Sequence, residues 1–476
     1  MTEPHVTLTL LHTNDIHSHF EQASRIAEYV AGVRKRAAPD RLLVVDNGDF
    51  LDRARMETEG TASAVNRAML EFVGYDATML GNNEGLSYTP GELESIFGGM
   101  SVPIVCANMT LTDTGLPPSW MVPTLVLERA GVRIGLIGLT AAFTDYYGFL
   151  GWEAEEPIET LRREVGKLRP EVDALIVLSH LGLRHDQRIA ADVPGIDVIL
   201  GGHTHHLLEV PLLVNGTAIC AAGKFGDYVG HLELGFDQDG RLASVTGGSL
   251  ATEGWPASSA FDEMVDRYRT LAKSAMSRTI ATLPEPLDAL PDRETPLPTL
   301  LAAAIRRLTG AEIGLANAGQ LLEGLPAGDV TAEKIHSICP SPINPCTIRL
   351  PGSLILRTLE ESLLPEFQHM EIRGFGFRCK VLGLLCMDGL EATADMDEAP
   401  YGRVKDARVN GIPLDPNGVY TVATLDMFTF GVGYAALKEG TEVRYYLPEF
   451  IRDVLAEALN DEELIAGARI PRWRFP

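Results

Sequence analysis

The sequence has few cysteines and no long hydrophobic run. Six of its 476 residues are cysteine, and no two of them form a C-x-x-C pair. Scattered cysteines of this kind favour reduced thiols over a disulfide framework. The apolar runs are interrupted well before the roughly 18 residues that a membrane-spanning helix needs, so we expect no transmembrane segment.

Basic residues are also scarce. Lysine and arginine number 40 against 65 aspartates and glutamates, so the formal net charge is -25. A surface of this charge repels nucleic-acid backbones and anionic lipid heads, and we therefore expect neither a nucleic acid nor a membrane as partner. An anionic small-molecule substrate would need local positive charge, for which bound metal ions are a natural source.

The first residues, MTEPHVTLTLLHTND, lack the marks of a secretory leader. They contain no basic region, no apolar core and no cleavage site of small residues. Together with the scattered cysteines, this predicts a cytoplasmic location.

The length and the residue pattern predict two domains of mixed α/β structure. A chain of 476 residues is too long for one ordinary core. In the first half, short apolar runs such as 6–11, 42–46, 77–80 and 174–179 predict strands, and helical patterns stand between them. Several of these runs end in polar or glycine-rich segments, which is where α/β folds carry their functional groups.

A helical pattern over 261–276 separates the two halves of the chain. We interpret it as the connector between domains. The predicted boundaries are 1–255 for the first domain, 256–282 for a linker helix and 283–476 for the second domain. The chain shows no internal repeat.

Five short motifs follow the predicted strands in the first half. Alternate residues on an extended segment face the same way, so the two side chains of an Asp-x-His or His-x-His motif can reach one ion. Together the motifs offer two aspartates, one asparagine and four histidines, enough for two cations if one carboxylate bridges them. The motifs are Asp15-Ile16-His17, Gly48-Asp49, Gly81-Asn82-Asn83-Glu84, Ser179-His180 and Gly201-Gly202-His203-Thr204-His205.

The mixture of imidazole and carboxylate ligands selects among metals. It suits manganese, zinc, iron or cobalt better than calcium or magnesium. A lone histidine or a lone Gly-Asp is usually a structural group or a turn. Five such motifs in order, each after a predicted strand, reverse that expectation and predict two divalent metal ions as cofactors.

The motifs also resemble those of a known family. In order, LHTNDIHSHF, DNGDF, GNNE, SHLG and GGHTHH resemble the motif set of the metallophosphoesterases, and specifically of the bacterial 5'-nucleotidase and UDP-sugar hydrolase family. In the second half, ANAGQLLEGLPAGDVT and PSPINPCTIRLPGSLILRTLE resemble the family's C-terminal nucleotide-binding domain. The resemblance implies an α/β (α+β) fold: a four-layer calcineurin-like sandwich, then a smaller α/β domain that closes over the metals. It also implies that the helix at 261–276 is the hinge of this closure.

The resemblance also implies a ligand set for two metals. The first ion would be held by Asp15, His17, Asp49 and His205, and the second by Asp49, Asn82, His180 and His203, so that Asp49 bridges. In this family a hydroxide between the metals attacks phosphorus.

The chain departs from the family's third motif, which reads Gly-Asn-His and then Glu or Asp. The family's histidine helps to stabilise the phosphoryl transition state and pairs with an aspartate three positions on, but Asn83 and Leu86 occupy these positions here. An asparagine cannot carry the charge or the proton of an imidazolium, and we expect its presence to raise the barrier by about 3 kcal/mol. We name Asn83, as a donor to the phosphoryl group, and His19, as a partial substitute, as catalytic candidates.

Candidates for substrate binding in the second half follow from the same resemblance. Aromatic side chains can sandwich a base, and arginines contact anions. The alternative, that the phenylalanines are core residues, agrees equally well with the sequence. The candidates are Asn317, Gly319, Arg373, Phe375, Phe377, Arg378, Phe428 and Phe430.

These observations predict a metal-dependent phosphoric ester hydrolase in nucleotide catabolism. Its substrates would be nucleotides or nucleotide-derived phosphates. Two alternatives stay open from the sequence. The first is hydrolysis of a different anionic ester, since a relative of this family cleaves thiosulfonate groups. The second is a catalytically weak nucleotide-binding sensor, because the usual histidine and aspartate are missing at Asn83 and Leu86.

Overall fold

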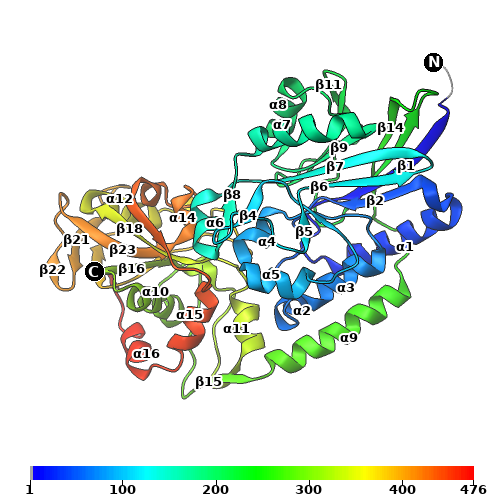
Figure 1. Cartoon of the computed structure of the whole chain (residues 1–476). Coiled ribbons are helices and arrows are strands. Elements are labelled where there is room, and N and C mark those ends of the chain that lie inside the picture. Colours follow the sequence, from blue (N-terminus) through cyan, green and yellow to red (C-terminus); the bar gives the residue numbers. More distant parts are fainter. Residues whose placement is uncertain (1–3) are drawn as a thin grey trace. The chain divides into compact units, whose positions relative to one another are not determined.

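The chain divides into two compact units. The structure, a computed structural model, describes residues 4–476, except the side chains of Pro39 and Asp145. The units are Met1–Ala272 and Lys273–Pro476 (Figure 1). Helix α9 (Ser259–Met276), which the sequence predicts at 261–276, contains the boundary between them. Its role as a hinge and the predicted domain limits stay predictions.

Two sheets form the centre of the first unit. The four-stranded sheet has the order β14-β13-β1-β2, with bounds Leu242–Ala251, Tyr228–Phe236, Val6–Thr13 and Leu42–Asp46. The six-stranded sheet has the order β11-β12-β10-β9-β7-β6, with bounds Leu212–Val214, Thr217–Ala221, Val198–Gly201, Ala174–His180, Val132–Thr140 and Thr124–Arg129.

Apolar side chains from both sheets share one core. Alternate residues of a strand face the same side of its sheet, and Leu8 and Leu10 of β1 meet Ile176 and Leu178 of β9 in this core. On the outer face of the six-stranded sheet, α7 (Pro157–Leu168) and α8 (Leu183–Asp192) form a second apolar cluster. Helices α1 (Phe20–Arg36) and α3 (Ala64–Val73) lie on the opposite side (Figure 1). This arrangement confirms the predicted four-layer sandwich.

The parallel strands bring their carboxyl ends together. Strand β1 runs parallel to β2, and β7, β9, β10 and β12 run parallel to one another. The strand predicted at 77–80 is a correction: this segment forms only two isolated bridges, Val45 with Ala77 and Thr78 with Ile104. It still leads into α4 (Asn82–Ser87) at the same edge.

The second unit has its own core, built around a mixed five-stranded sheet. The order is β19-β16-β23-β18-β24, with bounds Leu385–Asp388, Ile313–Asn317, Val419–Leu425, Pro345–Pro351 and Thr441–Tyr445. A four-stranded sheet, β22-β21-β20-β25, spans Ile412–Pro413, Val404–Val409, Leu390–Ala394 and Trp473–Arg474. Helix α10 (Pro296–Thr309) is buried along most of its length. No helix within residues 4–476 is both long and apolar enough to cross a bilayer.

Candidate metal centre

The seven predicted ligands all come from the first unit. His180 is the last residue of β9, Asn82 begins α4, and the other five lie in loops that follow β1, β2 and β10. Five of them have left-handed backbone angles, with φ between 47° and 69° at Asp15, His17, Asp49, His203 and His205. Such angles cost about 1–3 kcal/mol each in a residue other than glycine and persist where the surrounding structure enforces them. Strain of this kind gathers at functional sites and indicates that the loops are shaped for the side chains that they present.

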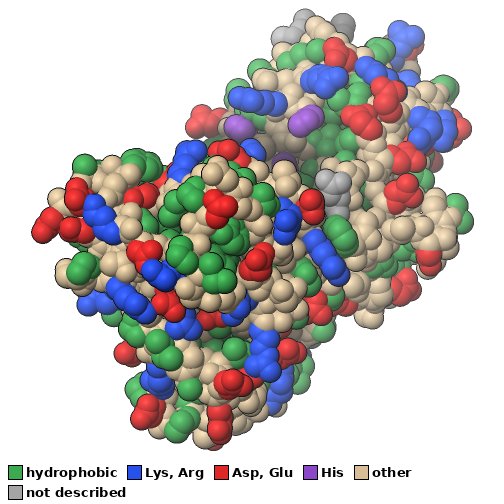
Figure 2. All heavy atoms as spheres, turned by 90° about the vertical axis from the view of Figure 1, so that its left-hand side faces the viewer, with side chains coloured by type: hydrophobic (Ala, Val, Ile, Leu, Met, Phe, Trp, Pro, Cys, Tyr) green, Lys and Arg blue, Asp and Glu red, His purple; other side chains and the backbone are tan. Residues whose placement is uncertain are grey.

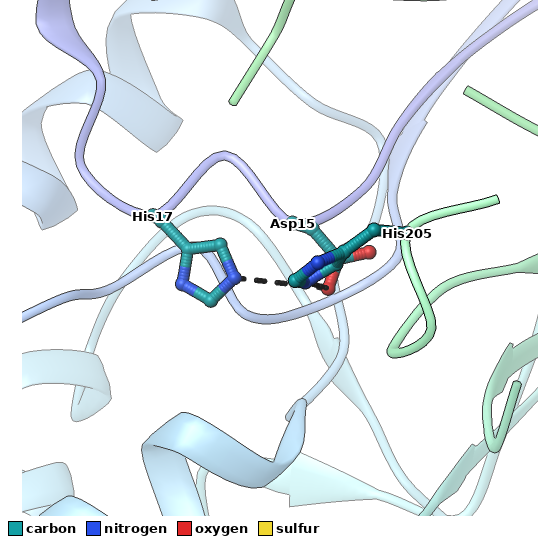
Figure 3. Close-up of side chains that lie close together, drawn as sticks. All are labelled: Asp15, His17 and His205. Atoms are coloured by element: carbon teal, nitrogen blue, oxygen red, sulfur yellow. Dashed lines mark ion pairs between the residues drawn. The ribbon is translucent and has the colours of Figure 1, made fainter. Parts of the chain in front are cut away.

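Asp15 lies between two imidazoles (Figure 3). The Nε2 atom of His17 is 3.8 Å from Asp15 Oδ1, and the Nε2 atom of His205 is 3.3 Å from the same oxygen. One ligand atom from each of these residues lies within 4.8 Å of the other two. This spacing suits a shared cation, since ligands around one metal ion approach each other closely.

Asp49 connects this group to a second one. Its Oδ2 is 3.8 Å from His17 Nε2, and its Oδ1 is 3.3 Å from His180 Nε2. Asp15, Asp49 and His180 therefore also form a group whose ligand atoms lie within 4.8 Å of one another. The two oxygens of Asp49 face different imidazoles, which is the arrangement that a bridging carboxylate requires.

The last two predicted ligands contact each other. The Nδ1 atom of His203 is 2.6 Å from Asn82 Oδ1. Burial lowers the pKa of His203 to about 4, so its imidazole is neutral at pH 7. A neutral imidazole and an amide oxygen are both competent ligands for a divalent cation.

Charge coupling dominates the buried part of the cluster. Burial acts to raise the pKa of Asp49, but His180 and His17 outweigh it and hold that pKa well below its usual range. Burial alone would lower the pKa of His180, yet Asp49 and Asp15 raise it to about 10. A divalent cation competes for the place of that proton, because metal ligands must be deprotonated.

The donor set fits divalent cations. The buried Nε2 atom of His180 forms no hydrogen bond to any residue that the structure describes. The other ring nitrogen, Nδ1, donates to the backbone carbonyl of Asn47 at 2.8 Å, which fixes the ring with Nε2 toward the carboxylates. An imidazole that is oriented in this way, with Nε2 3.3 Å from Asp49 Oδ1 and 3.7 Å from Asp15 Oδ1, suits a metal ligand.

Two residues that the sequence did not single out hold the ligand loops. The buried carboxylate of Glu84 accepts backbone N–H groups from Gly81 at 2.8 Å, Asp49 at 3.2 Å and Leu51 at 2.9 Å. It thereby fastens the start of α4 to the loop that carries Asp49. Glu84 stands in the GNNE motif, so its place beside the ligand Asn82 was a signal that could have found it.

Asn47 joins the two sheets where their strands end. Its side-chain Nδ2 donates to the carbonyls of Ser179 at 3.0 Å and Leu200 at 2.9 Å, at the ends of β9 and β10. The residue follows β2 directly. Asn47 therefore fixes the Asp49 loop relative to the segments that carry His180 and His203.

Asn83 lies behind a ligand. Its side-chain Nδ2 is 3.0 Å from His17 Nδ1, the ring nitrogen that faces away from Asp15 and Asp49. Asp52 Oδ2 lies 3.6 Å from the same nitrogen. The sequence predicted that Asn83 would donate to a phosphoryl group, but this geometry instead favours a role in orienting His17. Leu86 follows on the same helix, α4, and supplies no carboxylate.

His19 is held by the backbone and by a ring contact. Its Nδ1 donates to the carbonyls of Ile16 and His17, each at 3.0 Å. Its imidazole stacks on Phe225 with ring centroids 4.0 Å apart. These contacts stabilise the loop that carries His17, and the catalytic role predicted for His19 stays a prediction.

The candidates for substrate binding in the second unit separate into two groups. Phe377 and Phe428 are 4% and 0% exposed and belong to the core, where Phe428 packs on Tyr434. The expectation that these two contact a substrate is corrected, because a buried ring offers no face to a ligand. Phe375 is 54% exposed and stacks with Phe430 at a centroid distance of 6.0 Å.

The polar candidates of this unit differ in exposure. Asn317 is buried, and its side-chain Nδ2 donates to the carbonyl of Leu382 at 2.7 Å. A Cβ atom at Gly319 would lie 1.8 Å from the carbonyl oxygen of Val381, so glycine is required there by the close approach of the backbone. Arg373 is exposed and pairs with Glu371, and the backbone N–H of Arg378 donates to Ser341 Oγ.

The surface charge is not gathered into one acidic patch on the face drawn in Figure 2. Acidic and basic side chains are interspersed there, and histidine side chains gather in one area.

Comparisons with known proteins agree with the geometry. A family model described as calcineurin-like phosphoesterase matches residues 8–207, and one described as 5'-nucleotidase, C-terminal domain, matches residues 279–439. The uncharacterized metallophosphoesterase YunD of Bacillus subtilis is 34% identical, over 94% of this chain and 98% of its own.

Solved structures are similar over the whole chain. A 5'-nucleotidase precursor from Thermus thermophilus is 25% identical with a TM-score of 0.63 and covers 99% of both chains. The NAD nucleotidase of Haemophilus influenzae shares the fold at 17% identity, with a TM-score of 0.68, over 99% of this chain and 97% of its own.

Proposed function

We infer the function of this chain from its family: it belongs to the calcineurin-like phosphoesterases that carry a 5'-nucleotidase C-terminal domain. It is a metal-dependent phosphoester hydrolase. We propose that its substrates are nucleotides or nucleotide-derived phosphates and that it works with two divalent ions, of manganese, zinc, iron or cobalt. The cytoplasmic location and the role in nucleotide catabolism expected from the sequence stay predictions.

One observation carries the proposal of two ions. The oxygens of Asp49 face two different imidazoles, His17 at 3.8 Å and His180 at 3.3 Å. A carboxylate placed in this way supports two neighbouring ion positions. In the proposal, one position uses Asp15, His17 and His205 beside Asp49, and the other uses Asn82, His180 and His203.

The residues of the chain then have separable tasks. Bound divalent cations supply Lewis acidity and lower the pKa of water, which is the chemistry that ester hydrolysis needs. Asn47 and Glu84 fix the positions of the loops that carry the predicted ligands relative to one another. Asn83 and Asp52 flank His17 Nδ1, and the Asn83 amide can rotate by 180° to offer its oxygen to an Nδ1–H group.

The position of Asn83 affects which esters are good substrates. With Asn83 behind His17 and Leu86 in place of an aspartate, neither position supplies a proton to a departing alkoxide. We therefore propose a preference for leaving groups that need no proton, such as the phosphate of a pyrophosphate bond or a phenolate.

The second unit supports the nucleotide part of the proposal. The exposed Phe375 and the half-buried Phe430 form an aromatic pair on which a base can stack. Binding of a base here is carried over from the family and rests on these two rings.

A substrate panel tests the proposed function. Metal-stripped protein is refilled with manganese, zinc, iron or cobalt and offered nucleoside monophosphates, nucleotide-sugars, dinucleotides and aryl phosphates, beside an Asp49→Ala control. We expect turnover that depends on metal and is lost in the control, and faster turnover of anhydride and aryl esters than of alkyl esters. Turnover of thiosulfonate esters alone, or tight nucleotide binding without any turnover, would overturn it.

A further inference from the structure

A cavity of about 300 Å³ lies beside the metal cluster, within the first unit. Three segments form its walls: the residues after β7, the start of α7 and the segment that leads into α8. His203 completes it. The lining residues are Ala141, Ala142, Phe143, Glu156, Pro157, Ile158, Leu181, His185 and His203.

His203 connects the cavity to the cluster. Its Nδ1 lies 2.6 Å from Asn82 Oδ1, and its ring meets the edge of Phe143 at a centroid distance of 6.1 Å. One imidazole therefore separates the proposed position of an ion from the cavity. A molecule whose phosphate is held beside Asn82 and His203 has room in the cavity for the group attached to that phosphate.

The lining selects the chemistry of that group. Six of the nine described lining residues are apolar, and none of the nine is lysine or arginine. A carboxylate carried by a ring in this cavity would therefore meet no cationic side chain among them. The one acidic residue among these nine is Glu156, which caps α7 by accepting the backbone N–H of Glu159 at 2.7 Å. Its carboxylate cancels the favourable field of the helix N-terminus for an anion.

His185 adds a polar atom without adding a fixed positive charge. Its Nδ1 donates to the carbonyl of Leu181 at 3.1 Å, which orients the ring and leaves Nε2 on the other edge. With the aromatic ring of Phe143 and the carboxylate of Glu156, the cavity offers contacts that a cationic or hydrogen-bonding ring can use. Its volume is at the lower end of ligand pockets, so it suits one substituted ring and not a whole nucleotide.

We propose that this cavity binds the organic group nearest the hydrolysed phosphate, and that it selects an uncharged or cationic ring over an anionic one. The proposal rests on the proposed function and narrows one part of it: among phosphate esters whose leaving group is a ring, the preferred substrates carry a neutral or positively charged ring.

Three aryl phosphates of equal size test the selection. They carry a neutral ring (phenyl phosphate), a cationic ring (4-(trimethylammonio)phenyl phosphate) and an anionic ring (4-carboxyphenyl phosphate). For the metal-loaded enzyme we expect a KM at least 10-fold higher for the anionic ester than for the other two. Equal KM values for the three esters would overturn the proposal.

Two variants assign the selection to the cavity. Phe143→Ala should raise KM for the neutral and cationic esters about 5- to 10-fold, with little change in kcat or in inhibition by inorganic phosphate. Glu156→Gln keeps an oxygen to cap α7 and should remove most of the preference for the cationic ester over the neutral one. Phe149→Ala, an exposed phenylalanine of α6 (Thr144–Leu150) outside the cavity, is the matched control. If the ratios of KM among the three esters were the same in both variants as in wild type, the proposal would be overturned.

A binding experiment separates this proposal from the proposed function. If no ester is turned over, ligand-observed NMR measures directly whether phenyltrimethylammonium and benzoate bind to the cavity. Binding of the cation that weakens about 5-fold or more in Glu156→Gln and not in Phe149→Ala supports the cavity while hydrolysis fails. Absence of binding of both probes, or equal binding of both, overturns it.

Discussion

Replacing Asn83 by leucine separates two roles for this residue. The side-chain amide lies 3.0 Å from His17 Nδ1, on the edge of the ring opposite the carboxylates. The backbone N–H of Asn83 donates to Asp49 Oδ1 at 2.8 Å and is kept in the variant. Asn83→Leu is similar in size and removes the hydrogen bond to the imidazole, together with two longer contacts of the amide, each at 3.4 Å, with Asn82 Nδ2 and the Leu51 carbonyl.

The two roles predict effects on different quantities. Loss of a partner that orients a metal-binding histidine typically weakens metal affinity 10- to 100-fold, or about 1.4–2.7 kcal/mol. Loss of a hydrogen-bond donor to the developing charge lowers kcat about 100- to 1000-fold, or about 2.7–4 kcal/mol. Because the amide lies behind His17, we expect the first effect, with kcat at saturating metal within about 3-fold of wild type.

The assay measures both quantities on the same protein. Competition with a fluorescent chelator gives the metal Kd, and turnover of an aryl phosphate at saturating metal gives kcat. Ser95→Ala, in α5 (Pro90–Phe97), is a control outside the site. An unchanged metal Kd with kcat reduced 100-fold would refute the orienting role and restore the phosphoryl contact predicted from the sequence.

Three further variants test other parts of the account. Glu84→Gln replaces one of the two carboxyl oxygens that accept three backbone N–H groups, and it should lower the free energy of unfolding by about 1.5–3 kcal/mol in urea denaturation. A change below about 0.5 kcal/mol would contradict the tethering role. Phe430→Ala should weaken binding of an adenine nucleotide by about 1–3 kcal/mol in calorimetry. Phe428→Ala, in contrast, should destabilise the fold by about 3–5 kcal/mol because its ring is buried in the core. Equal nucleotide affinity in Phe430→Ala and wild type would contradict the proposal that a base stacks on Phe375 and Phe430. Burial acts to raise the pKa of Asp388, but hydrogen bonds from Arg472 and Arg306 outweigh it and lower the pKa. A carboxylate whose pKa is lowered in the folded state stabilises the protein above the unfolded-state pKa of about 3.9, and this stabilisation is lost as the pH falls below that value. The difference in free energy of unfolding between wild type and Asp388→Asn should therefore shrink from pH 5 to pH 3. A difference that stays constant over this range would contradict the prediction.

The ligand residues were predictable because they are local. Asp15 and His17, or His203 and His205, stand two residues apart, and each pair follows an apolar strand. Motif order and the position after a strand are properties of short segments, so the sequence alone places these side chains near strand ends. The extended geometry expected for the two pairs is wrong, because all four residues have left-handed backbone angles.

The residues that hold the site together were not predictable in the same way. Asn47 acts through carbonyl groups 132 and 153 residues away, at Ser179 and Leu200. Nothing in the local sequence of Asn47 marks those partners. The left-handed backbone angles of Asp15 and Asp49 likewise depend on the packing around the loops and not on residue preference.

Tertiary structure also explains why two other predictions from the sequence differ from the structure: the strand at 77–80 and the pairing of Phe428 with Phe430 as substrate contacts. The segment 77–80 has an apolar pattern typical of a strand, but it pairs with its neighbours only through single bridges, and pairing decides whether a strand forms. Phe428 and Phe430 stand two residues apart and both match an aromatic motif, yet Phe428 is fully buried and Phe430 is not. Burial of an aromatic ring depends on what packs against it.

The most direct test of the central claim is a titration of metal into stripped protein, with turnover of an aryl phosphate followed against metal equivalents per chain. We predict no turnover without metal, a rise that saturates at two equivalents, and no recovery in Asp49→Ala at any metal concentration. Turnover that is independent of metal, that saturates at one equivalent, or that survives in Asp49→Ala would contradict a two-ion site organised by Asp49.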